Sequence, residues 1–170
     1  MEEIEAGKLL DIFFNPTKAN QKWDAINKVE EHISSLPDKV WGDLVEDATP
    51  GLYIRQITLP KGTLLTSRIH KTCHPFVVTK GAITVYNTIG DTQELYHAGH
   101  KGITYPGTRR VLYTHEETTW TTYHPTNRIT NDFFNLESEE KQVIFDSIMS
   151  DIIQEYYNPL LINFDEGIFI

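Results

Sequence analysis

The fold is decided by the stretch GTLLTSRIHKTCHPFVVTKG, residues 62–81, together with GHKGITYPGTRRVLYT, residues 99–114. Both consist of short runs of β-branched and apolar residues separated by glycine turns, which is typical of β-strands joined in sequence. They also carry most of the basic side chains of the middle third, where residues 61–124 hold seven Lys and Arg against four Asp and Glu. We expect basic side chains from the two stretches to line one pocket.

Strand patterns continue on both sides of these stretches. The segment LYIRQITL, residues 52–59, alternates between apolar and polar side chains, and Pro60-Lys61-Gly62 ends it. Similar segments lie at residues 64–70, 75–79, 82–88, 92–97, 102–105, 109–114 and 118–124. Short strands at near-regular spacing indicate an antiparallel sandwich or barrel.

Both ends of the chain have helical periodicity. Residues 1–36 predict two helices joined at Asn15-Pro16-Thr17, and residues 137–157 predict a third. The apolar tail LLINFDEGIFI, residues 160–170, is expected to dock on this domain or on a neighbouring subunit. We therefore predict one globular unit with three parts. These are an N-terminal helical extension (1–48), a β-barrel (49–126) and a C-terminal helix with its tail (127–170).

Composition narrows the class of partner. The net charge of −9 argues against binding to a long nucleic acid, because neutralising phosphates requires clustered Lys and Arg. No run of about 20 apolar residues and no basic, then apolar, leader is present, so we expect a cytoplasmic protein that does not bind membranes. The single cysteine, Cys73, excludes an internal disulfide and is expected to be a packing residue or a free thiol. A positive middle third in an acidic chain predicts a small anionic ligand.

Side-chain alternation restricts which basic residues can share a pocket. If residues 66–70 form a strand, Arg68 and His70 lie on one face. Arg109 and Arg110 are adjacent, so they point to opposite sides and at most one of them belongs to a given pocket. The alternative for Arg109 is a surface ion pair with Glu116 or Glu117.

The spacing of glycines and basic residues resembles the cupin family. Its first motif is a glycine, five residues, His-x-His, three or four residues, Glu, six residues and a glycine. Here Gly62, Arg68-Ile69-His70, His74 and Gly81 stand at those positions. The resemblance covers roughly residues 50–125. It implies a small antiparallel double-sheet, or jelly-roll, barrel with a ligand site in its mouth.

The second cupin motif is a glycine, five residues, Pro-x-Gly, two residues, His, three residues and Asn. Here Gly99, Tyr105-Pro106-Gly107, Arg110 and Thr114 occupy the corresponding positions. The glycine frame of the family is therefore matched in both motifs.

The metal-ligand positions depart from the family pattern. Arg68 and Arg110 replace two histidines and His74 replaces the glutamate, and an arginine that keeps its proton repels a cation. These departures favour an anion site without a cofactor, and the alternative is a site for a divalent transition metal built from the remaining histidines. That metal set would be His70 and His74 with His124, or with His115.

A second resemblance concerns three shorter segments. HKT at 70–72 followed by His74, PGTRR at 106–110 and WTTYHPTN at 120–127 are similar to small cupin-like proteins of tailed bacteriophages. This resemblance carries no known activity. It implies the cytoplasm of an infected bacterium as the cellular setting.

The predicted ligand-binding residues are the basic side chains of the two stretches and the rings that could stack on a ligand. They are Arg68, His70, Lys71, His74, Tyr105, Arg109, Arg110 and Trp120. Phe76, Tyr53 and Tyr113 are further stacking candidates. The histidines in or beside predicted turns, His97, His100 and His115, are expected at the solvated surface.

Three functions are compatible with these patterns. The first is a non-enzymatic cupin-like barrel that binds a small anionic ligand such as a nucleotide, with sequestration of a host defence signal as its use in a phage. The second is a metal-dependent oxygenase or isomerase that uses His70 and His74. The third is a structural or assembly protein whose helical ends make the contacts. A homo-oligomer is expected under all three.

Overall fold

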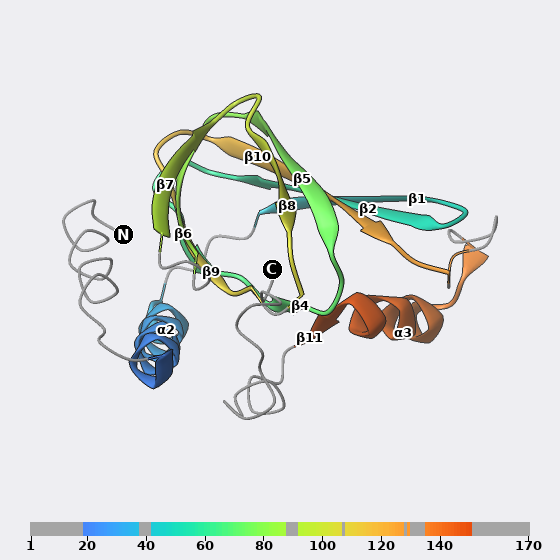
Figure 1. Cartoon of the computed structure of the whole chain (residues 1–170), viewed down its shortest axis with the longest axis horizontal. Coiled ribbons are helices and arrows are strands. Elements are labelled where there is room, and N and C mark those ends of the chain that lie inside the picture. Colours follow the sequence, from blue (N-terminus) through green and yellow to red (C-terminus); the bar gives the residue numbers. More distant parts are fainter. Residues whose placement is uncertain are drawn as a thin grey trace.

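The computed structural model of the chain describes residues 19–37, 42–87, 92–106, 108–127, 129 and 135–150 (Figure 1). Two antiparallel sheets form the body of the fold. The larger, sheet A, has the strand order β1-β2-β10-β5-β8. Its strands are β1 (Asp43–Thr49), β2 (Leu52–Leu59), β10 (Thr118–Pro125), β5 (His74–Lys80) and β8 (Lys101–Thr104).

The smaller sheet, sheet B, has the order β3-β9-β6-β7. Its strands are β3 (Leu64–Thr66), β9 (Arg110–Thr114), β6 (Ala82–Asn87) and β7 (Thr92–His97). The predicted fold class, an antiparallel double-sheet barrel with flanking helices, is confirmed by this arrangement.

An apolar core fills the space between the sheets. β-Branched and aromatic residues alternate along the strands, so that one face of each strand turns inward. Trp120 of β10 pairs with Ile57 of β2 and with Val78 of β5, which places all three on the inner face of sheet A. The buried residues of this core are Phe76, Val78, Ile83, Val85, Tyr96, Leu112 and Trp120. Each of these side chains contributes about 1.5–3 kcal/mol by leaving water.

Helix α2 (Ala19–Ser35) covers the outer face of sheet B. Ala25, Ile26 and Val29 recur at helix spacing and pack on Tyr86 and Val111. The inner strands β6 and β9 are therefore covered on both faces, which is why every residue in them is buried. The second of the two predicted N-terminal helices is confirmed, and the first lies outside the described residues.

Helix α3 (Ser138–Ile148) packs against sheet A, where Ile144 forms a third apolar cluster with Tyr53 and Ile129. The helix ends before the predicted residue 157. The next two residues form β11 (Met149–Ser150), which pairs with β4 (Ile69–His70). The apolar tail, residues 160–170, lies outside the described residues.

The strand predicted over residues 64–70 is interrupted. β3 ends at Thr66 and β4 begins at Ile69, so the strand over residues 66–70, on which the shared face of Arg68 and His70 depended, does not form. Sheet A also begins at Asp43, within the range 1–48 expected to be helical, because β1 forms a hairpin with β2.

The glycine turns that flank the two stretches adopt the conformation that glycine favours. Gly62, Gly81 and Gly99 have φ angles of 77°, 83° and 94°. At Gly81 an added Cβ would also lie 2.2 Å from the carbonyl oxygen of Glu117. Cys73, in the turn before β5, is a free and exposed thiol. Among the described residues, neither helix combines the length and the apolar character needed to cross a membrane.

Candidate functional site

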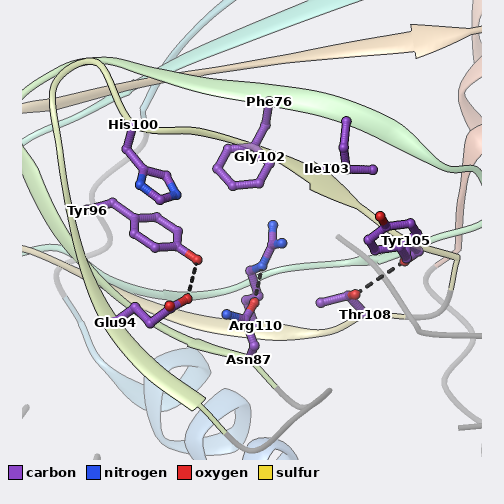
Figure 2. A pocket seen from close by; sticks show the side chains of 10 residues that line it. All are labelled: Phe76, Asn87, Glu94, Tyr96, His100, Gly102, Ile103, Tyr105, Thr108 and Arg110. Atoms are coloured by element: carbon purple, nitrogen blue, oxygen red, sulfur yellow. Dashed lines mark hydrogen bonds between the residues drawn. The ribbon is translucent and has the colours of Figure 1, made fainter. Parts of the chain in front are cut away.

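A cavity of about 230 Å³ opens where the free edges of the two sheets face each other. Strand β7 ends sheet B and β8 ends sheet A, and a turn between them contains Gly99. The cavity therefore takes its walls from both sheets and from the loop before β9 (Figure 2). Its lining residues are Phe76, Asn87, Glu94, Tyr96, His100, Gly102, Ile103, Tyr105, Thr108 and Arg110.

Arg110 is the charged residue buried most deeply in this lining, with an exposed fraction of 4%. Its Nε donates a hydrogen bond to the side-chain oxygen Oδ1 of Asn87, and its Nη1 donates to Thr104 Oγ1 at 3.2 Å. Figure 2 shows the guanidinium directed into the cavity beneath the Phe76 ring. Burial lowers the pKa of Arg110 to about 10, so the side chain keeps its positive charge at neutral pH.

Aromatic rings surround the guanidinium. The Cζ atom of Arg110 lies 5.0 Å from the ring centroid of Phe76 and 5.6 Å from that of Trp120, and the two rings stack with centroids 4.5 Å apart. Such cation–π contacts stabilise the buried charge. Gly102 on β8 leaves room for this stack, because an added Cβ would lie 2.8 Å from the Phe76 ring.

A second stack adjoins the first, with the ring centroids of Phe76 and Tyr96 6.0 Å apart. The rings of Tyr96 and His100 lie 3.6 Å apart and are nearly parallel, at 9°. Tyr96 donates its hydroxyl to Glu94 Oε2 at 2.7 Å, and burial, followed by this hydrogen bond, raises the pKa of Tyr96. Burial lowers the pKa of His100 below its ordinary value, which favours the neutral ring. The described lining thus carries one formal positive charge, on Arg110, and one formal negative charge, on Glu94.

Arg109 points to the other side of sheet B. It follows the alternation that directs Val111 toward helix α2, and its exposed fraction is 1%. It donates to Asn27 Oδ1 at 3.0 Å and forms an ion pair with Glu30, both on α2. Arg109 therefore does not line the cavity. The predicted alternation of Arg109 and Arg110 is confirmed.

The predicted alternative for Arg109, a surface ion pair with Glu116 or Glu117, is wrong. Glu117 pairs with Lys80 across the sheet, whereas Arg109 reaches Glu30 on the helix. Glu30 also accepts a hydrogen bond from Thr66 at 2.8 Å. The Arg109 pair thus ties helix α2 to sheet B.

His74 and His124 form a separate polar cluster inside the barrel. Both are buried, with exposed fractions of 1% and 0%, and their ring centroids lie 4.2 Å apart. His74 Nδ1 lies 3.1 Å from the Thr72 carbonyl oxygen, and His124 Nε2 lies 2.8 Å from Thr122 Oγ1. Burial lowers the pKa of His74 to about 4 and that of His124 to about 2, so both rings are neutral at neutral pH.

This cluster belongs to a polar row across sheet A. His124 pairs with Tyr53 of β2, and His74 pairs with Thr104 of β8. Thr104 accepts the hydrogen bond from Arg110. The row therefore reaches the floor of the cavity through one threonine.

The remaining predicted site residues lie in different places. Arg68 and Lys71 are exposed and do not line the cavity. Trp120 is buried behind Phe76, and Tyr105, 56% exposed, stands at the rim. The backbone of His70 lies in β4, and its side chain is outside the description.

Several lining residues were not predicted. His100 was expected at the surface, but backbone hydrogen bonds between Val78 and residues 99 and 100 hold it beside Tyr96. This pairing joins distant segments, so no local pattern indicates it. Glu94 was detectable in principle, because it alternates onto the same strand face as the buried Tyr96. His97 is exposed as predicted, whereas His115 is half-buried and lies 2.6 Å from Thr84 Oγ1.

The described residues do not fit a catalytic divalent metal. His74 and His124 supply two neutral imidazoles, but no group of three or more His, Cys, Asp or Glu side chains suited to a metal occurs in the described part of the chain. The charge of Arg110 also contributes to the low pKa of His74, and the same field opposes a cation.

Comparison with solved structures finds several similar proteins, among them the following three. A cupin-2 domain protein from Shewanella frigidimarina is 12% identical and matches over 58% of this chain and 92% of its own, with a TM-score of 0.40. An RmlC-like cupin family protein with a double-stranded β-helix fold, from Methanocaldococcus jannaschii, is 12% identical over 54% and 86%, with a TM-score of 0.43. An HTH_3 family transcriptional regulator from Vibrio cholerae is 15% identical over 60% and 62%, with a TM-score of 0.44.

Two further comparisons, with protein-family profiles and with curated proteins, find no match.

Proposed function

We propose that this protein is a non-enzymatic barrel that binds a small anionic ligand in the cavity between β7 and β8. One observation carries the proposal, namely a charged guanidinium that is almost fully buried and directed into an open cavity. A buried charge is costly unless it is paired, and its protein partners, Asn87 and Thr104, are neutral. An anion that binds Arg110 would gain a charge-assisted hydrogen bond in a site of low dielectric constant.

The test compares binding of small anions to the wild type and to Arg110→Gln, which removes the charge and keeps a polar side chain. Thermal shift with acetate, benzoate, inorganic phosphate, AMP and cyclic AMP gives the first ranking, and calorimetry gives the affinities. Binding to the wild type should fall by about tenfold or more in the variant, as expected for loss of one charge-assisted contact. Equal affinities in wild type and variant would refute the proposal, and so would the failure of every anion to bind.

A nucleotide is the narrower form of this proposal, with sequestration of a host defence signal as its use if the chain is phage-encoded. It would need its phosphate on Arg110 and its base near Tyr105 at the rim. A cavity of about 230 Å³ lies below the roughly 300–1,000 Å³ of pockets that enclose drug-sized ligands, so part of a nucleotide would stay outside. AMP and cyclic AMP in the panel test this form directly.

A metal-dependent enzyme is favoured by one observation only, the contact between the neutral rings of His74 and His124. Elemental analysis of untagged protein tests it. Stoichiometric zinc, iron, manganese or nickel that is lost in His74→Ala would favour this function over the anion binder.

An assembly function is favoured by the exposed edge of sheet A. Leu44 and Val45 of the edge strand β1 are 44% and 56% exposed. Unpaired strand edges with apolar side chains are suited to association. Light scattering after size exclusion should give a homo-oligomer, and dissociation by Val45→Lys would place β1 in the interface.

A further inference from the structure

The N–H groups of Arg110 that have no acceptor in the described part of the chain indicate which anionic group of a ligand can bind there. A guanidinium has five N–H groups, and two of them bond to Asn87 and Thr104. The other three have no hydrogen-bond partner among the described residues. This number suits the two oxygens of a carboxylate, which pair with a guanidinium fork. A phosphate dianion would carry two negative charges against the single positive charge of Arg110, so a carboxylate is the better match in charge.

The negative charge of Glu94 also favours a carboxylate ligand over a phosphate dianion. Glu94 lies on the described lining, and it contributes with Tyr96 to the electrostatic environment of Arg110. A dianion beside Arg110 would be repelled by this carboxylate. A ligand with one carboxylate and one N–H or O–H donor would match both charged residues, because Glu94 can accept from that donor.

The walls favour a flat ring. Phe76 stacks on Trp120 and Tyr96 stacks on His100, and because the Phe76 and Tyr96 centroids lie 6.0 Å apart, the rings form one aromatic cluster along the cavity (Figure 2). Ile103 and Tyr105 at the rim add apolar surface. Planar ligands bury apolar area against such walls and gain from aromatic contacts. The volume of about 230 Å³ equals the share of about seven or eight water molecules, which suits a single ring with small substituents.

We infer that the ligand of this cavity is a small planar ring that carries one carboxylate, bound by Arg110, and one hydrogen-bond donor, bound by Glu94. The inference rests on the proposed function and narrows it to one chemical class. Arg110 binds the carboxylate of the ligand. Glu94 favours those anions that also carry an N–H or O–H group, because it accepts a hydrogen bond from that group.

Calorimetry with four probes tests the inference on the full-length protein. Benzoate has the ring and the carboxylate, and 4-hydroxybenzoate adds a donor. Cyclohexanecarboxylate keeps the charge without the flat ring, and phenyl phosphate replaces the carboxylate by a dianion. The variants are Glu94→Gln, whose amide oxygen can still accept from Tyr96, and Arg110→Gln. Arg68→Gln is the matched control, because Arg68 is exposed and does not line the cavity.

The expected order of affinity is 4-hydroxybenzoate, then benzoate, then cyclohexanecarboxylate and phenyl phosphate, with about tenfold between the first two for one hydrogen bond to a charged group. Glu94→Gln should weaken 4-hydroxybenzoate by about threefold, because a neutral amide oxygen accepts less strongly than a carboxylate, and should leave benzoate unweakened. Arg110→Gln should weaken every probe, and Arg68→Gln should weaken none.

Two results would overturn the inference in different ways. If phenyl phosphate binds more tightly than benzoate, or Glu94→Gln weakens both carboxylates equally, the ligand class is wrong while the anion site on Arg110 stands. If Arg110→Gln binds all four probes like the wild type, or no probe binds the wild type, the inference and the proposed function both fail.

Discussion

Arg109 and Arg110 are adjacent in the chain, yet they serve opposite faces of sheet B. Arg110 turns into the cavity between the sheets, and Arg109 turns outward to Asn27 and Glu30 on helix α2. Two arginines of equal charge and nearly equal burial therefore differ in role. Substituting each in turn separates the contribution of a buried guanidinium to stability from its contribution to binding.

We predict that Arg109→Ala destabilises the protein and does not change ligand affinity. The substitution leaves Glu30 and Asn27 without their partner and loosens the contact between α2 and sheet B, at a cost of about 1–3 kcal/mol. Urea unfolding measures the loss, and benzoate calorimetry in native buffer checks the affinity. An unchanged midpoint would show that this pair does not hold α2 in place.

We predict that Arg110→Met abolishes anion binding. The substitution removes a charge that is costly to bury but leaves Asn87 Oδ1 and Thr104 Oγ1 without their donor, so a stability loss of about 1–3 kcal/mol is expected as well. A folded Arg110→Met variant that still binds anions at wild-type affinity would contradict the assigned role of this guanidinium.

Gly102→Ala should damage the cavity without touching a charged residue. The new methyl group would lie 2.8 Å from the Phe76 ring, so the ring must leave its place over the guanidinium. We expect a stability loss of about 1–3 kcal/mol from overpacking and a weaker binding of planar anions. Gly51→Ala is a control for stability alone: its φ of +82° is strained by any side chain, but nothing lies within 4 Å of an added Cβ there.

The buried histidines predict a stability that falls as the solution becomes acidic. His74 and His124 have folded-state pKa values of about 4 and about 2, below the ordinary 6.5 of the unfolded chain. The unfolded state therefore binds more protons between pH 6.5 and about 4, and stability rises with pH through that window. Each histidine adds a slope of up to about 1.4 kcal/mol per pH unit.

Urea unfolding between pH 7.5 and 5.0 measures this slope above the range in which most carboxylates titrate. His124→Asn should remove about half of it. A wild-type stability that stays constant across this range would contradict the burial of two neutral imidazoles.

Much of the fold could be predicted from the sequence because its signals are local. The alternation in residues 52–59 and the positive φ angles at Gly62, Gly81 and Gly99 depend on neighbouring residues only, and the strands and turns lie where these patterns indicate. The break between Thr66 and Ile69 was missed, because it follows from the pairing of β4 with the distant β11.

The site was less predictable, because its contacts join residues that are distant in the sequence. Arg110 was identified from its position in a motif, and alternation correctly separated it from Arg109. The other polar residues of the lining come from other strands and a turn, and only the three-dimensional arrangement brings them to Arg110. They are Asn87, Glu94 and His100. Arg68 and Lys71 carried the same sequence signal as Arg110 but lie at the surface.

A crystal structure with a bound anion is the most direct test of whether Arg110 binds the anionic group of a ligand. Crystals would be soaked separately with 4-hydroxybenzoate and with AMP. We predict that the anionic group of at least one probe lies between β7 and β8 with an oxygen about 2.7–2.9 Å from the Arg110 guanidinium. Density for both probes elsewhere in the molecule, with no anion on Arg110, would contradict it.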